Sequence, residues 1–447
     1  MSNVFYRDIT KSYPKAVKSH GMYIFDETGN QYLDMSGGAA VSPVGHSHPK
    51  VVDALCEQIK TMSFAHTAFF TNDPQEKLAE IISAKFSEAN ASEANAKVYF
   101  TSGGTEANET AFKLVWQYWK ILGKTKKQKI ISRTHSYHGN SYAALSISGN
   151  LPRRRVMGDL LLDWPRIGPC YSYRGLHADE TEQQYALRCA NELEEIILKE
   201  GSENIAAFIA EPVVGASLGV VASSIGYFKR IREICDQYDI LLIADEIMCG
   251  SGRTGTFFAH EQDDFLPDIV TLAKGIAGGY QPLAATIARA KIHQVFIDNA
   301  AGFNHGHTYV GHASACAAGL AVLNVIDQED LLKNVKIQGE NLQAALIDAF
   351  NDHPYVGDIR GRGLFRAIEF VADKESKTPF ADHLQITKKL KNSVMENGLI
   401  CYPGGGSMQD NLGSHLLIAP PYILQEQHID QFIEKLKMIM ADVFNEQ

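Results

Sequence analysis

Short apolar runs alternate with amphipathic stretches through the middle of the chain. Runs rich in Val, Ile, Leu, Phe and Ala are typical of buried strands. We predict strands at Lys97–Thr101, Lys129–Ser132, Ile205–Ala210, Ile240–Ala244, Asp268–Ala273 and Ala284–Ala288. Between them, apolar residues recur at helical spacing in Glu106–Leu122, Ala186–Lys199 and Tyr227–Gln237. Such alternation indicates an α/β fold with a mostly parallel sheet that helices cover on both faces.

The N-terminal part of the chain has a different pattern. Residues 21–38 alternate apolar and polar positions around Thr28–Asn30, which predicts a β-hairpin. The following segment, Val51–Met62, has the spacing of a helix. One face of this helix carries Val52, Leu55, Cys56 and Ile59.

The C-terminal part again differs from the middle. Residues 329–350 and 426–445 have the spacing of long amphipathic helices. They enclose a Gly-rich turn at Arg360–Gly363, a strand-like segment at Leu364–Val371 and a Gly/Pro stretch at Pro403–Gly406. We therefore expect a second domain, of the α+β class, to begin near residue 330.

Composition and charge narrow the class of protein. The 447 residues carry a formal net charge of −10, which argues against nucleic acid or an anionic membrane as the main partner. The uncharged stretch between Glu211 and Lys229 is broken by Gly and Ser and is too short for a membrane-spanning helix. The seven cysteines form no CxxC pair, so neither a disulfide framework nor a structural zinc site is favoured, and we expect a cytoplasmic protein.

A carboxylate and a lysine stand at the ends of two consecutive predicted strands. Asp245 follows Ile240–Ala244, and Lys274 follows Asp268–Ala273. The carboxyl ends of neighbouring parallel strands face one crevice, where ligands bind. Burial there lowers the pKa of a lysine and makes it nucleophilic, as a Schiff base requires, while Asp245 could pair with a protonated ring nitrogen. The alternative is a structural ion pair.

A Gly-rich turn leads from a strand into a helix at Ser102–Thr105. Gly103 and Gly104 permit a tight turn, and a helix N-terminus presents unpaired N–H groups to an anion. Ser102 and Thr105 add hydroxyl donors. The segment could therefore hold a phosphate, although it lacks the Walker and GxGxxG patterns, and a plain helix cap explains it equally well.

Two further segments carry candidate residues. In Ser136–Gly139, an aromatic side chain beside glycine could stack on a flat cofactor. In Phe303–His312, three histidines accompany Thr308, but their spacing lacks the HExxH pattern and no carboxylate is near, so a zinc site is disfavoured.

Together, a Schiff-base lysine, a partner for a pyridinium, a phosphate cup and a stacking aromatic describe a pyridoxal phosphate site. The sequence resembles the class III aminotransferases, which are pyridoxal phosphate enzymes of fold type I, along essentially its whole length. The matching segments are TSGGTEANETAFKLV, HSYHGN, AEPVVGA, LLIADEIMCGSGRTG, LAKGIAGGYQPLAA and HGHTYVGHASACAAGLAVL.

The resemblance implies a role for each matching residue. Lys274 would form the Schiff base and Asp245 would pair with the pyridine nitrogen, which makes these two the catalytic residues. Tyr137 would stack on the ring, and Thr308 would reach the phosphate of the neighbouring subunit. The implied cofactor-binding set is Ser102, Gly103, Gly104, Thr105, Tyr137, His138, Gly139, Glu211, Asp245, Lys274 and Thr308.

The resemblance also implies the architecture and the assembly. A large domain at residues 61–330 would carry a mostly parallel seven-stranded sheet. A smaller α+β domain would combine residues 1–60 with residues 331–447. The subunits would form a homodimer with shared active sites, and a tetramer is a further option.

The activity implied is transfer of an amino group from an amine or ω-amino acid to a keto acid, pyruvate or 2-oxoglutarate, by a ping-pong mechanism. Relatives that act on 4-aminobutyrate or ornithine carry a glutamate where this chain has Ala216, whereas amine:pyruvate relatives have a small residue there. Ala216 therefore favours an amine or ω-amino acid donor. The arginine that amine:pyruvate relatives carry before Pro420–Pro421 is missing, and Arg153–Arg155 and Arg174 are possible replacements. Small residues at Gly37–Ala40 suggest a roomy pocket. A phospho-amino-alcohol lyase or a racemase of the same family remains an alternative.

Overall fold

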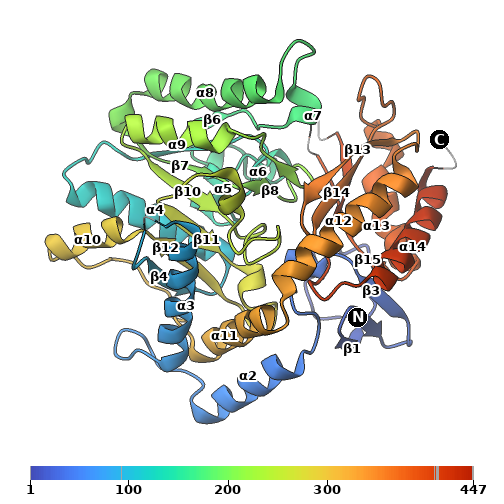
Figure 1. The fold of residues 1–447 in the computed structure, drawn as a ribbon, viewed down its shortest axis with the longest axis horizontal. Coiled ribbons are helices and arrows are strands. Elements are labelled where there is room, and N and C mark those ends of the chain that lie inside the picture. The colour runs from blue at the N-terminus through green and yellow to red at the C-terminus, as the bar shows by residue number, and fades with distance from the viewer. Residues whose placement is uncertain (1, 92, 407, 409–411, 445–447) are drawn as a thin grey trace.

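A seven-stranded sheet forms the centre of the computed structural model, which describes residues 2–91, 93–406, 408 and 412–444 (Figure 1). Its strands, in spatial order, are β4 (Lys97–Thr101), β12 (Ala284–Ala288), β11 (Ile269–Leu272), β10 (Leu241–Asp245), β7 (Ile205–Ala210), β5 (Lys129–Arg133) and β6 (Arg166–Ile167). Only β12 runs antiparallel to its neighbours. The mostly parallel seven-stranded sheet is therefore confirmed.

Helices cover both faces of this sheet, because side chains along a strand point alternately to opposite sides. On β10, Leu242 and Ala244 belong to the core cluster that contains the buried residues of α8 (Glu182–Glu200) and α9 (Tyr227–Gln237). Their neighbour Ile243 belongs to a second cluster, packed against α4 (Gly104–Ile121). The uninterrupted apolar strands in the sequence follow from this two-sided burial.

The chain ends build two further sheets, on the right of Figure 1. The first contains β1 (Ala16–His20), β2 (Tyr23–Asp26), β3 (Gln31–Asp34) and β15 (Leu399–Ile400), with β15 parallel to β3. The second contains β13 (Val356–Arg362), β14 (Phe365–Phe370), β17 (Ser414–Ile418) and β16 (Tyr402–Gly405). The long helices of this half are α12 (Leu331–Phe350), α13 (Ile386–Glu396) and α14 (Glu426–Phe444). The domain boundaries at residues 60 and 330 stay predictions.

The remaining elements are short or connect these sheets. The helices are α1 (Gly37–Ala40), α2 (Pro49–Thr61), α3 (Asp73–Ala89), α5 (Tyr142–Ile147), α6 (Leu151–Met157), α7 (Ser172–Gly175), α10 (Ala290–Asp298) and α11 (Ala313–Gln328). The strands β8 (Val213–Val214) and β9 (Val221–Ala222) form a small hairpin. Among the described residues, none of the helices is both long and apolar enough to cross a membrane.

Several boundaries differ from the sequence prediction. The predicted turn at Arg360–Gly363 is wrong for its first three residues, which pair with β14 as the end of β13; the glycine at position 361 adopts a φ of 136° that other residues rarely adopt. Helix α4 begins two residues early, so Thr105 lies in its first turn. The predicted end of the last helix at residue 445 lies outside the described residues.

Candidate active site

Lys274 lies directly beyond the carboxyl end of β11, in the crevice of the central sheet. It begins a short 3-10 turn, Lys274–Ile276, with a φ of 49° that is unusual for a residue with a side chain. Its Nζ donates a hydrogen bond to the carbonyl oxygen of Ala39, 3.0 Å away, in the loop that contains α1. Burial lowers the pKa of Lys274 to about 8, against the opposing effect of the charge of Asp245. A useful fraction of this amine is therefore neutral and nucleophilic near neutral pH.

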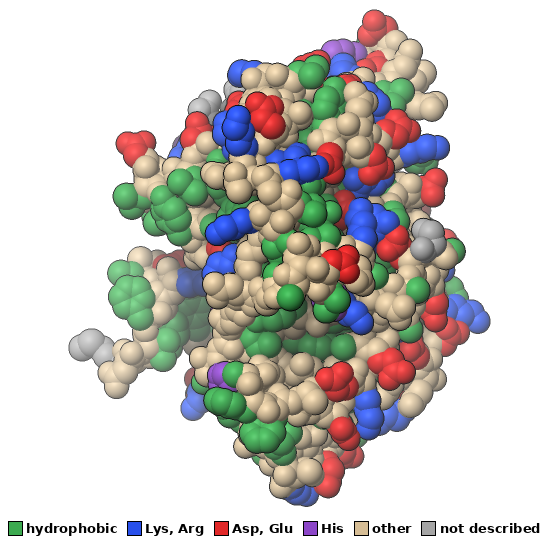
Figure 2. All heavy atoms as spheres, turned by 90° about the vertical axis from the view of Figure 1, so that its left-hand side faces the viewer, with side chains coloured by type: hydrophobic (Ala, Val, Ile, Leu, Met, Phe, Trp, Pro, Cys, Tyr) green, Lys and Arg blue, Asp and Glu red, His purple; other side chains and the backbone are tan. Residues whose placement is uncertain are grey.

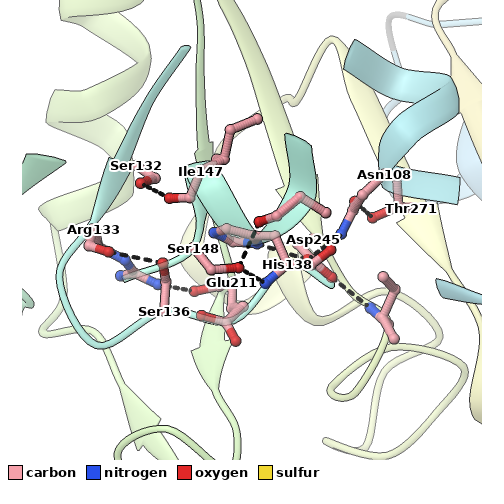
Figure 3. A network of polar contacts seen from close by, with 12 residues as sticks. Asn108, Ser132, Arg133, Ser136, His138, Ile147, Ser148, Glu211, Asp245 and Thr271 are labelled. Carbon is pink, nitrogen blue, oxygen red and sulfur yellow. Dashed lines mark hydrogen bonds and ion pairs between the residues drawn. The ribbon is translucent and has the colours of Figure 1, made fainter. Parts of the chain in front are cut away.

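Asp245 ends the neighbouring strand and is almost completely buried. Its Oδ2 lies 2.8 Å from Nδ1 of His138 and accepts a hydrogen bond of 2.8 Å from Nδ2 of Asn108. Its Oδ1 accepts from the backbone N–H of Ile247 at 3.1 Å. Figure 3 shows these contacts converging on the carboxylate, which is thus fixed in place and kept from water.

Asn108 anchors this network and was missed by the sequence prediction. Its Nδ2 also donates to the carbonyl of His138 at 2.7 Å, and its Oδ1 accepts from the hydroxyl of Thr271 at 2.9 Å (Figure 3). The residue is fully buried on α4. The one available signal was a polar residue in phase with the apolar face of the predicted helix, beside Ala107 and Ala111.

The N-terminus of α4 forms a cup beside this network. Gly103 is its N-cap residue, and a Cβ built on Gly103 would meet nothing within 4 Å. A Cβ on Gly104 would instead meet Ile247 at 2.9 Å, and one on Gly139 would meet the side chain of Thr105 at 2.8 Å. The cup is therefore open in front of Gly103 and closely walled elsewhere. Ser102 is the remaining residue of the predicted cup. Its backbone N–H donates a hydrogen bond of 2.8 Å to Oε2 of Glu106.

Tyr137 and Glu211 lie near the same centre. The half-buried ring of Tyr137 lies 4.4 Å from the guanidinium carbon of Arg153, and its hydroxyl accepts a hydrogen bond of 3.0 Å from Nη1 of that arginine. Glu211 follows β7, and its Oε2 is buried without a partner among the described residues. Burial, helped by the charge of Asp245, raises the pKa of Glu211 to about 8.

The arginines considered for carboxylate recognition separate into two groups. Arg174 pairs with the buried Glu369 at 2.5 Å, and Arg154 donates to the carbonyls of Leu145, Ser146 and Ser148. Arg174 and Arg154 therefore stabilise the fold through these contacts. Arg153 lies on Tyr137, and Arg155 is exposed on the same short helix α6.

Thr308 is exposed in the loop between α10 and α11, in contrast to the buried residues around Asp245. Nearby, His305 Nε2 lies 2.9 Å from the hydroxyl of Thr110, and the rings of His305 and His307 meet edge to face at 4.8 Å. No group of three or more His, Cys, Asp or Glu side chains suited to a metal occurs in the part of the chain that the structure describes.

The comparisons with known proteins agree with this geometry. The family model "Aminotransferase class-III" matches residues 7–440, so the chain belongs to the class III aminotransferases. An uncharacterized aminotransferase of Schizosaccharomyces pombe is 38% identical over 97% of this chain and 94% of its own length. A vanillin aminotransferase of Capsicum chinense and gamma aminobutyrate transaminase 2 of Solanum lycopersicum are each 37% identical over 93% of this chain and 88% and 89% of theirs.

Solved structures give the same result for the fold. The ω-transaminase of Pseudomonas jessenii in complex with PMP has a TM-score of 0.90 at 34% identity, covering 97% of this chain and 93% of that chain. An (S)-enantioselective ω-transaminase of Thermomicrobium roseum has a TM-score of 0.89 at 34% identity, covering 97% and 94%. The fold type I assignment is confirmed.

Class III aminotransferases depend on pyridoxal phosphate, and this chain is an aminotransferase with that cofactor. Its residues fit the group. The open space in front of Gly103, at a helix N-terminus, suits a phosphate. Lys274 offers an amine of lowered pKa, and Asp245 a buried carboxylate whose charge acts on that amine.

Proposed function

We propose that this aminotransferase takes an amino group from an amine or an ω-amino acid and passes it to a keto acid, pyruvate or 2-oxoglutarate, in two successive half-reactions. The observation that carries the proposal is the placement of Lys274 and Asp245 at the ends of adjacent strands. The lysine is largely buried with a pKa near 8, and the aspartate is buried with three hydrogen-bond donors fixed on it. The small Ala216, which lines a neighbouring pocket, leaves room for amines and ω-amino acids.

Each group of residues in the site would have a separate role in the reaction. Pyridoxal phosphate, when bound, supplies an electrophilic carbon and an electron-accepting ring. Asp245 would hold a proton on the ring nitrogen, because a buried carboxylate favours a neighbouring positive charge. Lys274 would take the Cα proton of the donor with its neutral Nζ and deliver it elsewhere on the reacting skeleton. Tyr137 would pack on the ring, and the N-terminus of α4 would bind the phosphate through Gly104 and Thr105.

The remaining predicted residues would support these groups. His138 and Asn108 would keep the Asp245 carboxylate in one orientation, as their 2.8 Å contacts indicate. Gly139 and Ser102 would shape the cup, and Glu211 would close the far side of the site. These assignments rest on the geometry and on the family pattern.

We further propose that the protein works as a homodimer in which Thr308 serves the partner's site. Thr308 is exposed and makes no recorded hydrogen bond to the other site residues that the structure describes. Exposed aromatic side chains begin at the next residue, Tyr309, which contacts Phe64; Phe64 in turn contacts His66, and His66 contacts Phe69. We call Phe64, Phe69 and Tyr309 the aromatic patch. The rings of Phe64 and Tyr309 lie 6.1 Å apart, and Phe69 is 79% exposed. Patches of this kind mark interaction surfaces in soluble proteins.

Other surface features agree with a dimer. On α2, Val52 and Ile59 are exposed although Val51 on the same helix is buried. Hydrophobic side chains also gather at several places on the face that carries α10, between charged ones (Figure 2). We expect a stable dimer by light scattering.

One experiment tests the reaction class. The protein loaded with cofactor is mixed with an amine donor and no acceptor, and the cofactor spectrum is followed. Conversion to the aminated cofactor, in an amount equal to the active sites, supports transamination. A lyase would release its product with no such conversion, and a racemase would return the donor inverted.

A second experiment tests the shared site. Lys274→Ala and Thr308→Ala subunits are unfolded, mixed and refolded together. Hybrids should contain one site with both residues intact and regain activity above either parent. If the mixtures stay at the level of the parents, Thr308 does not act across the interface.

A further inference from the structure

A pocket of about 440 Å³ opens beside Tyr137, between α6 and α13. Arg153 and Lys391 both line it, together with Asn150, Ala216 and Tyr402. Among the described residues that line it, there is no Asp or Glu. Two cations without a counter-charge in one concave space form a site for an anion.

Arg153 is held in position for such a role. Its guanidinium stacks on the ring of Tyr137 at 4.4 Å, and one Nη donates to the tyrosine hydroxyl at 3.0 Å. Among the described residues it makes no ion pair, whereas Arg174 and Arg154 are bound to Glu369 and to backbone carbonyls. The planar guanidinium therefore keeps N–H donors for a two-pronged contact with a carboxylate.

The pocket is also close to the reacting groups. The positive charge of Arg153 is one of the causes that lower the pKa of Lys274, which places the guanidinium within the field of the amine. Tyr137 lies between the pocket and the cofactor site, since it contacts Arg153 and is one of the proposed cofactor-binding residues. A substrate that reaches Lys274 with its reacting carbon can extend its other end along Tyr137 toward the pocket.

We propose that Arg153 is the residue that binds the substrate carboxylate, with Lys391, which lines the same pocket, adding positive charge. The substrates favoured are then ω-amino acids and the ω-oxo acids formed from them, whose carboxylate lies several bonds from the reacting carbon. This inference rests on the proposed function, because it assigns the specificity of the same site.

The test compares a donor that carries a carboxylate with one that does not. The donors are 4-aminobutyrate and butylamine, and the variants are Arg153→Gln, Arg153→Lys and the control Arg155→Gln. Arg155 is an exposed arginine on the same helix that does not line the pocket. The rate of cofactor amination is measured for each donor at saturating cofactor, to give kcat/KM of the half-reaction.

The expected result is a selective loss. A charge-assisted contact with a carboxylate is worth about 10- to 100-fold in kcat/KM. Arg153→Gln should lose that factor with 4-aminobutyrate and change less than about threefold with butylamine. Arg153→Lys should recover part of the loss because the charge remains while the fork geometry is gone. Arg155→Gln should change neither donor.

Binding of an inert anion gives a readout that needs no turnover. Butyrate should bind the cofactor-loaded protein in calorimetry, and Arg153→Gln should raise its Kd by the same factor. Equal losses with both donors, or an unchanged Kd for butyrate, would overturn the assignment. If neither donor aminates the cofactor, yet the protein binds butyrate through Arg153, the proposed function is refuted and the anion site stands.

Discussion

Replacement of Asp245 by asparagine removes one charge from the centre of the site and leaves its volume almost unchanged. The carboxylate oxygens face three groups: Nδ1 of His138, Nδ2 of Asn108 and the N–H of Ile247. An amide has a single oxygen, so in either orientation its NH₂ group faces at least one donor. An unsatisfied buried donor costs about 1–3 kcal/mol, and we expect the variant to fold with reduced stability.

The larger effect is electrostatic. A pair of opposite charges about 4 Å apart interacts by about 4 kcal/mol at an effective dielectric constant near 20. Asp245→Asn removes that attraction for a protonated ring nitrogen. Each 1.4 kcal/mol corresponds to about a tenfold change in rate, so turnover should fall roughly 1,000-fold.

The assay must separate binding from catalysis. The cofactor retained after gel filtration is measured by absorbance, and the amination rate is then expressed per loaded site. Asp298→Asn, an exposed substitution at the end of α10, serves as the matched control. Turnover of Asp245→Asn within tenfold of the unsubstituted protein, at equal loading, would refute this account of the carboxylate.

Three other predictions follow from the geometry. Cofactor capture by the empty protein should increase with pH, with a midpoint near 8, because Lys274 must be neutral and burial sets its pKa near 8; a midpoint near 10 by absorbance would contradict this. Gly104→Ala should weaken cofactor retention, since the new Cβ meets Ile247 at 2.9 Å, and Ile247→Ala should restore it; Gly302→Ala, which lies outside the cup and has open space at its Cβ, is the control. Asn108→Leu should lower the free energy of unfolding by about 3–5 kcal/mol through three lost hydrogen bonds, and a urea titration showing less than about 1 kcal/mol would count against that network.

The inner strands of the central sheet, β7, β10, β11 and β12, could be predicted because every residue in them is buried. β7 and β12 have the predicted bounds, Ile205–Ala210 and Ala284–Ala288. The two-residue strand β6 carries no periodicity of its own, and it exists because it pairs with β5. β16 contains a proline and two glycines, which argue against a strand, but it lies at the edge of its sheet, where proline is tolerated.

The candidate site, like the fold, could be predicted from the sequence only in part. Lys274 and Asp245 could be found because each stands at the end of a recognisable strand, and parallel strands end at one edge. The contact of Nζ of Lys274 with the carbonyl of Ala39 could not be predicted, because it joins residues 235 positions apart through a loop with no chemical motif. The role proposed for Arg153 also required the structure, because the sequence places it beside two other arginines of identical chemistry.

The pairing of β3 with β15 also determines when the N-terminal sheet can form during synthesis of the chain. Leu33 lies opposite Leu399, so the sheet that contains the start of the chain cannot close until nearly the whole chain has been made. At synthesis rates of about 5–20 residues per second, the first strands wait roughly 20–70 s for their partner. The central sheet, complete by residue 288, can form during that interval. Newly made chains would thus expose an unpaired edge at β3, which is where a chaperone would be expected to protect them.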